Sequence, residues 1–145
     1  GLVAFVASMM LYAVASGNAH DARSLDNQAI RRTASTSCSA LNSVLESRSL
    51  DRVADIRGGN AAIQVLVDAM EALDEDTLAD DEPALDWIAD WKRLASSRAT
   101  FAEALEGGAD ASFAVPMTDG YPITERMADV APEDCSRAVE LAAIP

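Results

Sequence analysis

The chain has 145 residues and a mass of 15.3 kDa, which is enough for one compact domain and too little for two domains with separate cores. Half of its residues are hydrophobic and 24% are charged, so the composition indicates a folded protein rather than a disordered acidic chain. The formal net charge of −13 argues strongly against nonspecific nucleic-acid binding, because an acidic surface repels phosphate backbones.

The N-terminal segment is apolar almost without a break. No charged residue occurs from Gly1 to Ala19, and a membrane-crossing helix needs about 20 such residues. We therefore predict a transmembrane or signal-anchor helix over residues 1–18, with Tyr12 as an interfacial anchor. Because the chain opens with Gly rather than Met, we expect this helix to be the end of a longer apolar run. Residues 19–145 would then form an extracytoplasmic domain.

Two other interpretations of this segment stay open. It fits the hydrophobic region of a secretory signal peptide, with a small-residue cleavage site at residues 13–15 or 17–19. The protein would then be secreted rather than anchored in the cell membrane. The third interpretation is a helix buried in a soluble core. The residues that precede this segment would distinguish an anchor from a cleaved signal, because their positive charges set the orientation.

Cys38 and Cys135 are the two cysteines of the chain, and they form neither a CxxC pair nor part of a zinc-ligand set. The one histidine, His20, leaves a zinc site without its four ligands, so we expect neither a metal nor another cofactor. After an export-type segment, two such cysteines favour one disulfide in an oxidising compartment. The alternative is a pair of buried free thiols.

Beyond the apolar segment the chain has helical periodicity. Apolar residues recur every three to five positions from Leu25 to Leu45, which predicts one face of a long first helix. No Pro or Gly occurs over residues 19–46, so this helix is expected to run on directly from the membrane segment.

Glycine, asparagine and proline mark the later boundaries. A short amphipathic piece over residues 50–56 is expected to end at the glycine pair 58–59, and Asn60 would cap a second helix. A third helix is predicted from the acidic stretch before Pro83 to the glycine pair 107–108. The tail contains an extended stretch, residues 113–116, and then the turn Asp119-Gly120. A short helix follows from Pro122 to Val130 and is stopped by Pro132.

The apolar faces of the predicted helices indicate an all-α fold. Three amphipathic helices can bury a shared apolar stripe, which gives a three- to four-helix bundle outside the cytoplasm. The C-terminal tail has too little core of its own. We expect the disulfide to clamp it across the first helix.

Charge is concentrated in the second part of the chain. The net charge is +1 over residues 1–60, −10 over residues 61–112 and −4 over residues 113–145. The densest acidic patch supplies four candidate ligands for a weak cation site, namely Asp74, Asp76, Asp80 and Asp81. Because the spacing does not match a calcium-binding loop, a solvated loop with helix caps is the simpler interpretation.

The third predicted helix carries three candidate ligand contacts, Trp87, Trp91 and Arg98. Two tryptophans one turn apart can stack on a sugar or an aromatic group, although a pair on the apolar face of a helix more often packs in the core. Arg98 lies on the same face of this helix. We expect it to form a buried pair with an acid, either Glu103, Glu106 or one in the tail, and so to dock the segment that follows the helix.

The apolar N-terminal segment, Cys38, Trp91 with Arg98, and Cys135 near the end together resemble small single-pass membrane or secreted proteins of actinobacteria or their phages. The preference for arginine over lysine, with Lys92 as the one lysine, suits a high-GC genome. The resemblance implies a location at the cell envelope and a helical shape. It transfers no catalytic residue and no known activity.

Three functional hypotheses follow. The first is a membrane-tethered extracytoplasmic interaction module that binds a protein partner at the cell envelope. The alternative is a ligand-sensing extracytoplasmic domain of a bacterial receptor, with a small molecule held near Trp87 and Trp91. The third, an enzyme, is disfavoured because the lone histidine leaves Ser and Cys nucleophiles without their usual base, and we expect no enzymatic activity.

Overall fold

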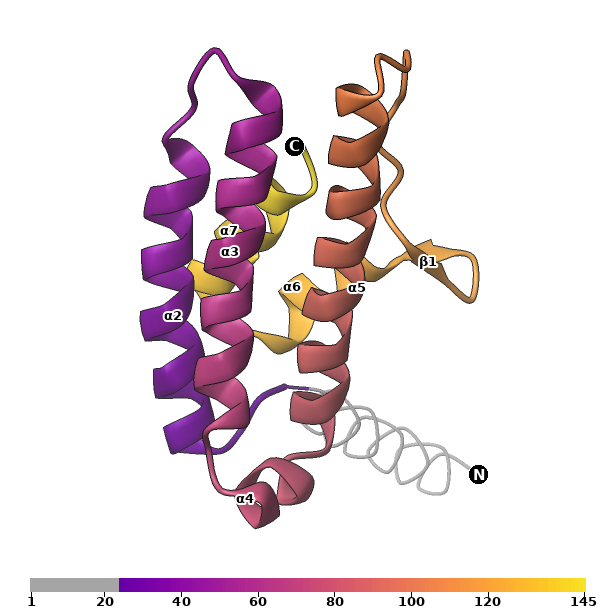
Figure 1. Ribbon diagram of the computed structural model, residues 1–145. Coiled ribbons are helices and arrows are strands. Elements are labelled where there is room, and N and C mark those ends of the chain that lie inside the picture. The colour runs from indigo at the N-terminus through magenta and orange to yellow at the C-terminus, as the bar shows by residue number, and fades with distance from the viewer. Residues whose placement is uncertain (1–23) are drawn as a thin grey trace, which may run out of the picture.

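The computed structural model describes residues 24–145, and the predicted membrane helix over residues 1–18 lies outside the described residues. Figure 1 shows long helices packed side by side, with the later, shorter helices behind them. The elements are α2 (Gln28–Glu46), α3 (Arg52–Glu71), α4 (Glu75–Asp80), α5 (Glu82–Glu106), β1 (Met117–Thr118), β2 (Tyr121–Pro122), α6 (Ile123–Val130) and α7 (Glu133–Ala142). The predicted helical bundle is therefore confirmed. In this part of the chain, no helix is both long and apolar enough to cross a bilayer.

Helix α2 begins at Gln28 and is capped by Asn27. The Asn27 side chain accepts hydrogen bonds at 2.9 and 3.2 Å from two main-chain N–H groups of the first turn. The prediction that this helix runs on directly from the N-terminal segment is wrong, because residues 25–27 are not helical. They are held by Asp81, whose carboxylate accepts the main-chain N–H groups of residues 26 and 27 at 3.1 Å.

Helix α3 continues through Gly58 and Gly59, where the sequence predicted a turn. Asp51, rather than Asn60, caps this helix. Gly59 lies where α3 comes closest to Arg98 of α5, and a Cβ atom there would stand 2.6 Å from Arg98 Nη2. The glycine therefore makes room for a buried side chain and does not end the helix.

The ends of α5 and the turn in the tail agree with the sequence prediction. Asp81 is the N-cap residue of α5, Pro83 lies in its first turn and Gly107 is its C-cap. In the tail, Asp119 and Gly120 connect β1 to β2 with φ angles of 52° and 84°. A two-residue hairpin turn of this type needs positive φ at both positions. The hairpin projects from the body of the molecule (Figure 1).

The C-terminal tail ends in a helix that the sequence analysis missed. Residues 133–142 form α7, which packs along α2. Cys135 of α7 is bonded to Cys38 of α2, with an S–S distance of 1.99 Å, so the predicted disulfide is confirmed. The first turn of α7 is also attached to α2 by the Ser35 hydroxyl, which donates to Asp134 at 2.6 Å. The tail is therefore fastened across the first helix of the bundle, as predicted.

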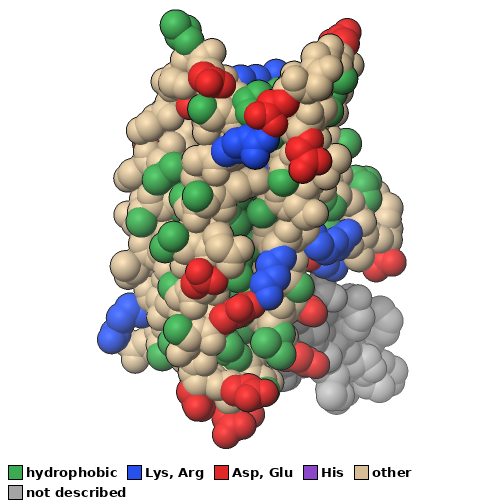
Figure 2. Space-filling model, in the orientation of Figure 1, with side chains coloured by type: hydrophobic (Ala, Val, Ile, Leu, Met, Phe, Trp, Pro, Cys, Tyr) green, Lys and Arg blue, Asp and Glu red, His purple; other side chains and the backbone are tan. Residues whose placement is uncertain are grey.

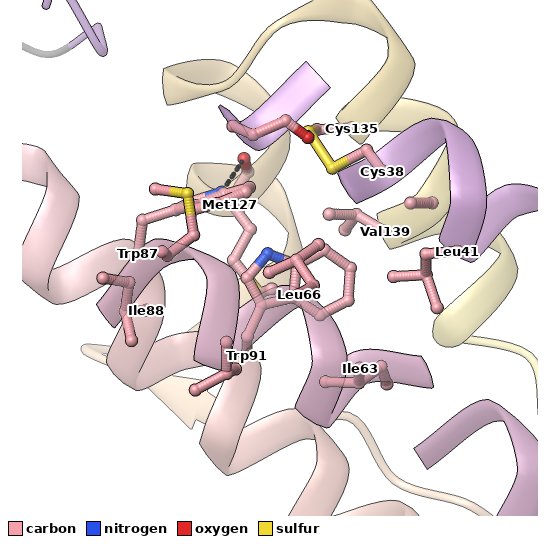
Figure 3. Packing of buried hydrophobic residues seen from close by; sticks show 14 of the residues in the cluster. Cys38, Leu41, Ile63, Leu66, Trp87, Ile88, Trp91, Met127, Cys135 and Val139 are labelled. Atoms are coloured by element: carbon pink, nitrogen blue, oxygen red, sulfur yellow. Dashed lines mark hydrogen bonds between the residues drawn. A yellow bond between two sulfur atoms is a disulfide. The ribbon is translucent and has the colours of Figure 1, made fainter. Parts of the chain in front are cut away.

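The core lies between these helices (Figure 3). Trp87 and Trp91 are both buried, with ring centroids 5.9 Å apart and planes at 89°, an edge-to-face contact. The indole N–H of Trp87 donates to the main-chain oxygen of Met127 in α6 at 3.0 Å. A smaller apolar cluster around Phe101 fills the space near the other end of α5. The tryptophan pair therefore joins α5 to the C-terminal helices.

The disulfide closes a long loop, since 97 positions separate its cysteines in the sequence. The chain-entropy model gives about 4–5 kcal/mol of stabilisation for a loop of this size. We expect the Cys38→Ala/Cys135→Ala variant to lose roughly this much free energy of unfolding, measured by urea denaturation. Mass spectrometry of the unreduced protein should detect one peptide pair joined through these cysteines. Two thiols that alkylate in the native, freshly isolated protein would contradict this prediction.

The two glycines of α3 provide a matched pair of substitutions. Gly58→Ala should stabilise the protein by about 0.4–1 kcal/mol, because nothing lies within 4 Å of the new methyl group and alanine favours a helix. Gly59→Ala should instead destabilise it by about 1–3 kcal/mol, because the methyl group displaces Arg98. Thermal denaturation of both variants tests this difference, and equal effects would show that Arg98 is not confined by Gly59.

Candidate functional site

An acidic groove lies between the first half of α5 and α6. It has a volume of about 630 Å³. Four of its lining carboxylates are exposed to solvent, namely Glu82, Asp86, Asp119 and Asp129. Glu82 and Asp86 are four positions apart and therefore share a face of α5, while Asp119 comes from the hairpin turn and Asp129 from α6. The groove therefore collects negative charge from three separate elements of the fold.

A charged pair holds the two walls of the groove together. Asp90 of α5 is 3% exposed, and its carboxylate accepts two hydrogen bonds from Arg126 of α6, at 2.6 and 2.7 Å. This fork-to-fork geometry is the strongest form of Arg–carboxylate contact. The Asp90 hydrogen bonds raise the pKa of Arg126, so the arginine stays charged. The pair therefore joins the two walls of the groove, and Arg93 Nη1 lies 3.7 Å from the same Asp90 carboxylate. Within residues 24–145, none of the four exposed carboxylates of the groove forms an ion pair.

The hairpin at the end of the groove is attached to α5 by Arg93. The Arg93 guanidinium donates to the Thr118 hydroxyl at 2.8 Å and to the Met117 main-chain oxygen at 3.1 Å. At the base of the hairpin, the Ile123 N–H donates to the Pro116 oxygen at 2.9 Å. These contacts hold the turn that carries Asp119 in place, so the hairpin is a fixed wall of the site.

An aromatic side chain lies beside these carboxylates. Tyr121 is 67% exposed, and it lines a second hollow of about 280 Å³ together with Asp119, Glu125 and Asp129. This hollow shares Asp119, Arg126 and Asp129 with the acidic groove, so the two form one continuous surface. An exposed tyrosine among carboxylates can bind a cation through both its ring and the adjacent charges.

The structure does not gather the three predicted ligand contacts around one pocket. Trp87 and Trp91 are buried core residues, and only Trp87 is among the residues that line the acidic groove. Arg98 lines a different cavity, near the end of α7. The three side chains therefore do not line one shared pocket of the described chain.

The predicted pairing of Arg98 with an acid is wrong. Arg98 is buried, and no carboxylate between residues 24 and 145 forms an ion pair with it. Its Nε donates instead to the Asn60 side-chain oxygen at 2.9 Å, and its Nη1 donates to the Ala142 main-chain oxygen at 2.7 Å. Neutral acceptors on α3 and α7 take the place of the acid. Arg98 therefore docks α7, not the segment after α5.

Two of the four aspartates proposed as a weak cation site bind the ends of helices. Asp74 accepts the Thr77 N–H and caps α4, and Asp81 binds the main chain before α2. Asp76 and Asp80 are exposed on α4. Figure 2 shows acidic side chains gathered over this end of the molecule. Across the described residues, no three metal-ligand side chains converge, so the structure does not assemble these aspartates into a cation site.

Sequence reasoning did not find the acidic groove. The spacing of Glu82, Asp86 and Asp90 at intervals of four was a usable signal, because it places three carboxylates along one face of a helix. The other half of the site depends on α6 packing against α5, and no local pattern announces that contact. Residue spacing does not show that Asp90 of α5 pairs with Arg126 of α6, and this pair joins the two walls of the groove.

Removing one partner of the Asp90–Arg126 pair should lower the free energy of unfolding. Arg126→Ala leaves a buried carboxylate without its two donors, and we expect a loss of about 1–3 kcal/mol, reduced from the fully buried case because Arg126 is half exposed. As a control, Arg137→Ala breaks the solvent-exposed pair with Glu46 and should cost under about 0.5 kcal/mol. Urea denaturation measures both, and equal losses would contradict the proposed role of the pair.

The chain was compared with known proteins in three ways. Neither the protein-family models, nor the curated proteins, nor the solved structures include a match. The resemblance to small envelope proteins of actinobacteria therefore stays a prediction.

Proposed function

We propose that this protein is an extracytoplasmic interaction module that binds a basic segment of a protein partner in the acidic groove. The residues before the bundle would tether it to the cell membrane, with the helical domain in the envelope space. The main supporting observation is the groove itself. Four exposed carboxylates surround the Asp90–Arg126 pair, which joins the two walls of the groove.

Charge complementarity supports a basic partner. Exposed carboxylates on a fixed surface steer cationic groups toward it and raise the rate of encounter. Lysine and arginine side chains can bind the carboxylates of Asp86 and Asp129, while the exposed ring of Tyr121 offers a cation–π contact. Met117, also exposed on the hairpin, adds an apolar contact of the kind enriched in interfaces.

The disulfide supports the compartment part of the proposal. Such bonds form and persist in the periplasm, in the extracellular space and in other oxidising compartments, and they are rare in the cytosol. The Cys38–Cys135 bond is buried between α2 and α7, where it contributes to the fold. This fits a chain that folds after export.

Binding of a basic peptide tests the groove. Fluorescence anisotropy of labelled tetra-arginine should report saturable binding that weakens with added salt, while labelled tetra-glutamate should not bind. Reversing two groove charges with Asp86→Lys/Asp129→Lys should weaken the affinity for tetra-arginine by about tenfold or more.

A matched control separates the groove from the overall charge of the protein. Glu103→Lys/Asp110→Lys changes the net charge by the same amount, and both residues are exposed and lie outside the groove. This variant should change the affinity by less than about twofold, because distant surface charges are screened. If both double variants weaken binding equally, the affinity for the peptide depends on the net charge of the protein and the groove proposal is wrong.

A further inference from the structure

An apolar hollow lies on the other flank of α5 from the acidic groove. It has a volume of about 320 Å³, and it lies where α4 and the end of α3 meet the first half of α5. Figure 1 shows this corner at the lower end of the bundle, where α4 connects α3 to α5. Four large aliphatic side chains line the hollow, namely Leu73, Leu78, Leu85 and Ile88. We call it the leucine hollow.

The leucine hollow is open because α4 covers only part of α5. Helix α4 has six residues, and Leu78 is its one buried residue. Leu78 and Ile88 belong to the main core and are 5% and 4% exposed, so they form the floor of the hollow. Leu85 stands at its rim and is 53% exposed. A half-exposed leucine that adjoins a hollow with an apolar floor is typical of a surface that binds a partner.

The charged groups around the leucine hollow are mostly acidic. Lys92 is the one basic residue that lines it, and Lys92 is paired with Glu71. Glu75 also lines the hollow, and within the described chain it forms no ion pair. Asp76 and Asp80 are exposed on the same short helix, and Figure 2 shows acidic side chains gathered at this end of the molecule. An apolar group that binds here is therefore favoured when positive charge accompanies it.

The first half of α5 lies between the leucine hollow and the acidic groove. Residues four positions apart share a face of a helix. Glu82, Asp86 and Asp90 line the groove, while Leu85 and Ala89 line the hollow. A helix with its side chains is about 10–12 Å wide, so a chain segment of a few residues can cross α5 and reach both surfaces.

We propose that the partner of the acidic groove carries an aliphatic side chain near its basic segment, and that this side chain binds in the leucine hollow. The inference rests on the proposed function and adds an apolar anchor to its electrostatic contacts. Buried anchors supply most of the affinity at many interfaces, whereas exposed charges act mainly on rate and orientation. The hollow, at about 320 Å³, is near the lower limit for ligand sites, which suits one or two aliphatic side chains.

Two labelled peptides that differ only in the anchor test the inference on the full chain. The first is tetra-arginine followed by three glycines and two leucines, and in the second two serines replace the leucines. Three glycines span up to about 10 Å, close to the width of a helix. Each peptide is also made in the reverse order, so that either chain direction is sampled. In at least one order, the leucine peptide should bind about fivefold or more tightly than its serine counterpart in fluorescence anisotropy.

A substitution at the rim shows where the leucines bind. Leu85→Ser removes a half-exposed side chain, and it should reduce the leucine advantage to less than about twofold. The affinity for tetra-arginine alone should stay within about twofold, because no groove carboxylate is changed. Leu50→Ser is the matched control, because Leu50 is fully exposed in the connection between α2 and α3, at the other end of the bundle (Figure 1). This variant should keep the full leucine advantage.

The possible results separate the hollow from the groove. If tetra-arginine binds and the leucines add nothing in either order, the hollow is not part of the interface and the proposed function stands. If the leucine advantage persists in Leu85→Ser, or is lost equally in Leu50→Ser, the leucines bind elsewhere and the inference is overturned. If none of the peptides binds, the proposed function and the apolar anchor are both wrong.

Discussion

Helix α7 has only ten residues, and a helix this short is not stable in water without tertiary support. Its attachment to the bundle is therefore the constraint on which the C-terminal half of the structure depends. The disulfide joins its first turn to the middle of α2. At the other end, Arg98 donates to the oxygen of Ala142, the last residue of α7, while Arg48 and Arg52 bind the chain just beyond it. With both ends fixed, α7 completes the core and supports α6, which packs against it and in turn forms one wall of the acidic groove.

Arginine contacts attach α5 to the C-terminal helices in two different ways. Near its N-terminus, Glu82 and Asp86 contribute to a negative groove whose internal cation, Arg126, is neutralised by Asp90. Toward its C-terminus, the buried Arg98 donates to two neutral oxygens, of Asn60 and Ala142. One rigid helix is thus fastened to the tail at two places, each time through an arginine. The arginine pairs with a carboxylate at the first place and with neutral oxygens at the second.

Local patterns in the sequence predicted most of the helices. The apolar repeat predicted α2, and Pro83 with the glycines at 107–108 predicted the limits of α5. The pair Gly58-Gly59 was misread as a turn, because the reason for Gly59 is Arg98, which lies far along the chain. Likewise, the acceptors of Arg98 are an amide inside α3 and a main-chain oxygen of a helix that was not predicted. The acidic groove and the surroundings of Arg98 both arise from contacts between distant segments, and residue spacing alone does not reveal such contacts.

The disulfide also sets how the molecule responds to a protease. It closes a covalent ring that contains α3, α4, α5, the hairpin and α6, and the exposed connections of this ring, such as the one after Gly107, are its accessible points. A single cut there leaves two fragments that are still joined through sulfur and packed in one core. The fragments separate only when the bond is reduced, so a nicked molecule can keep its shape where proteases are abundant and reductants are scarce.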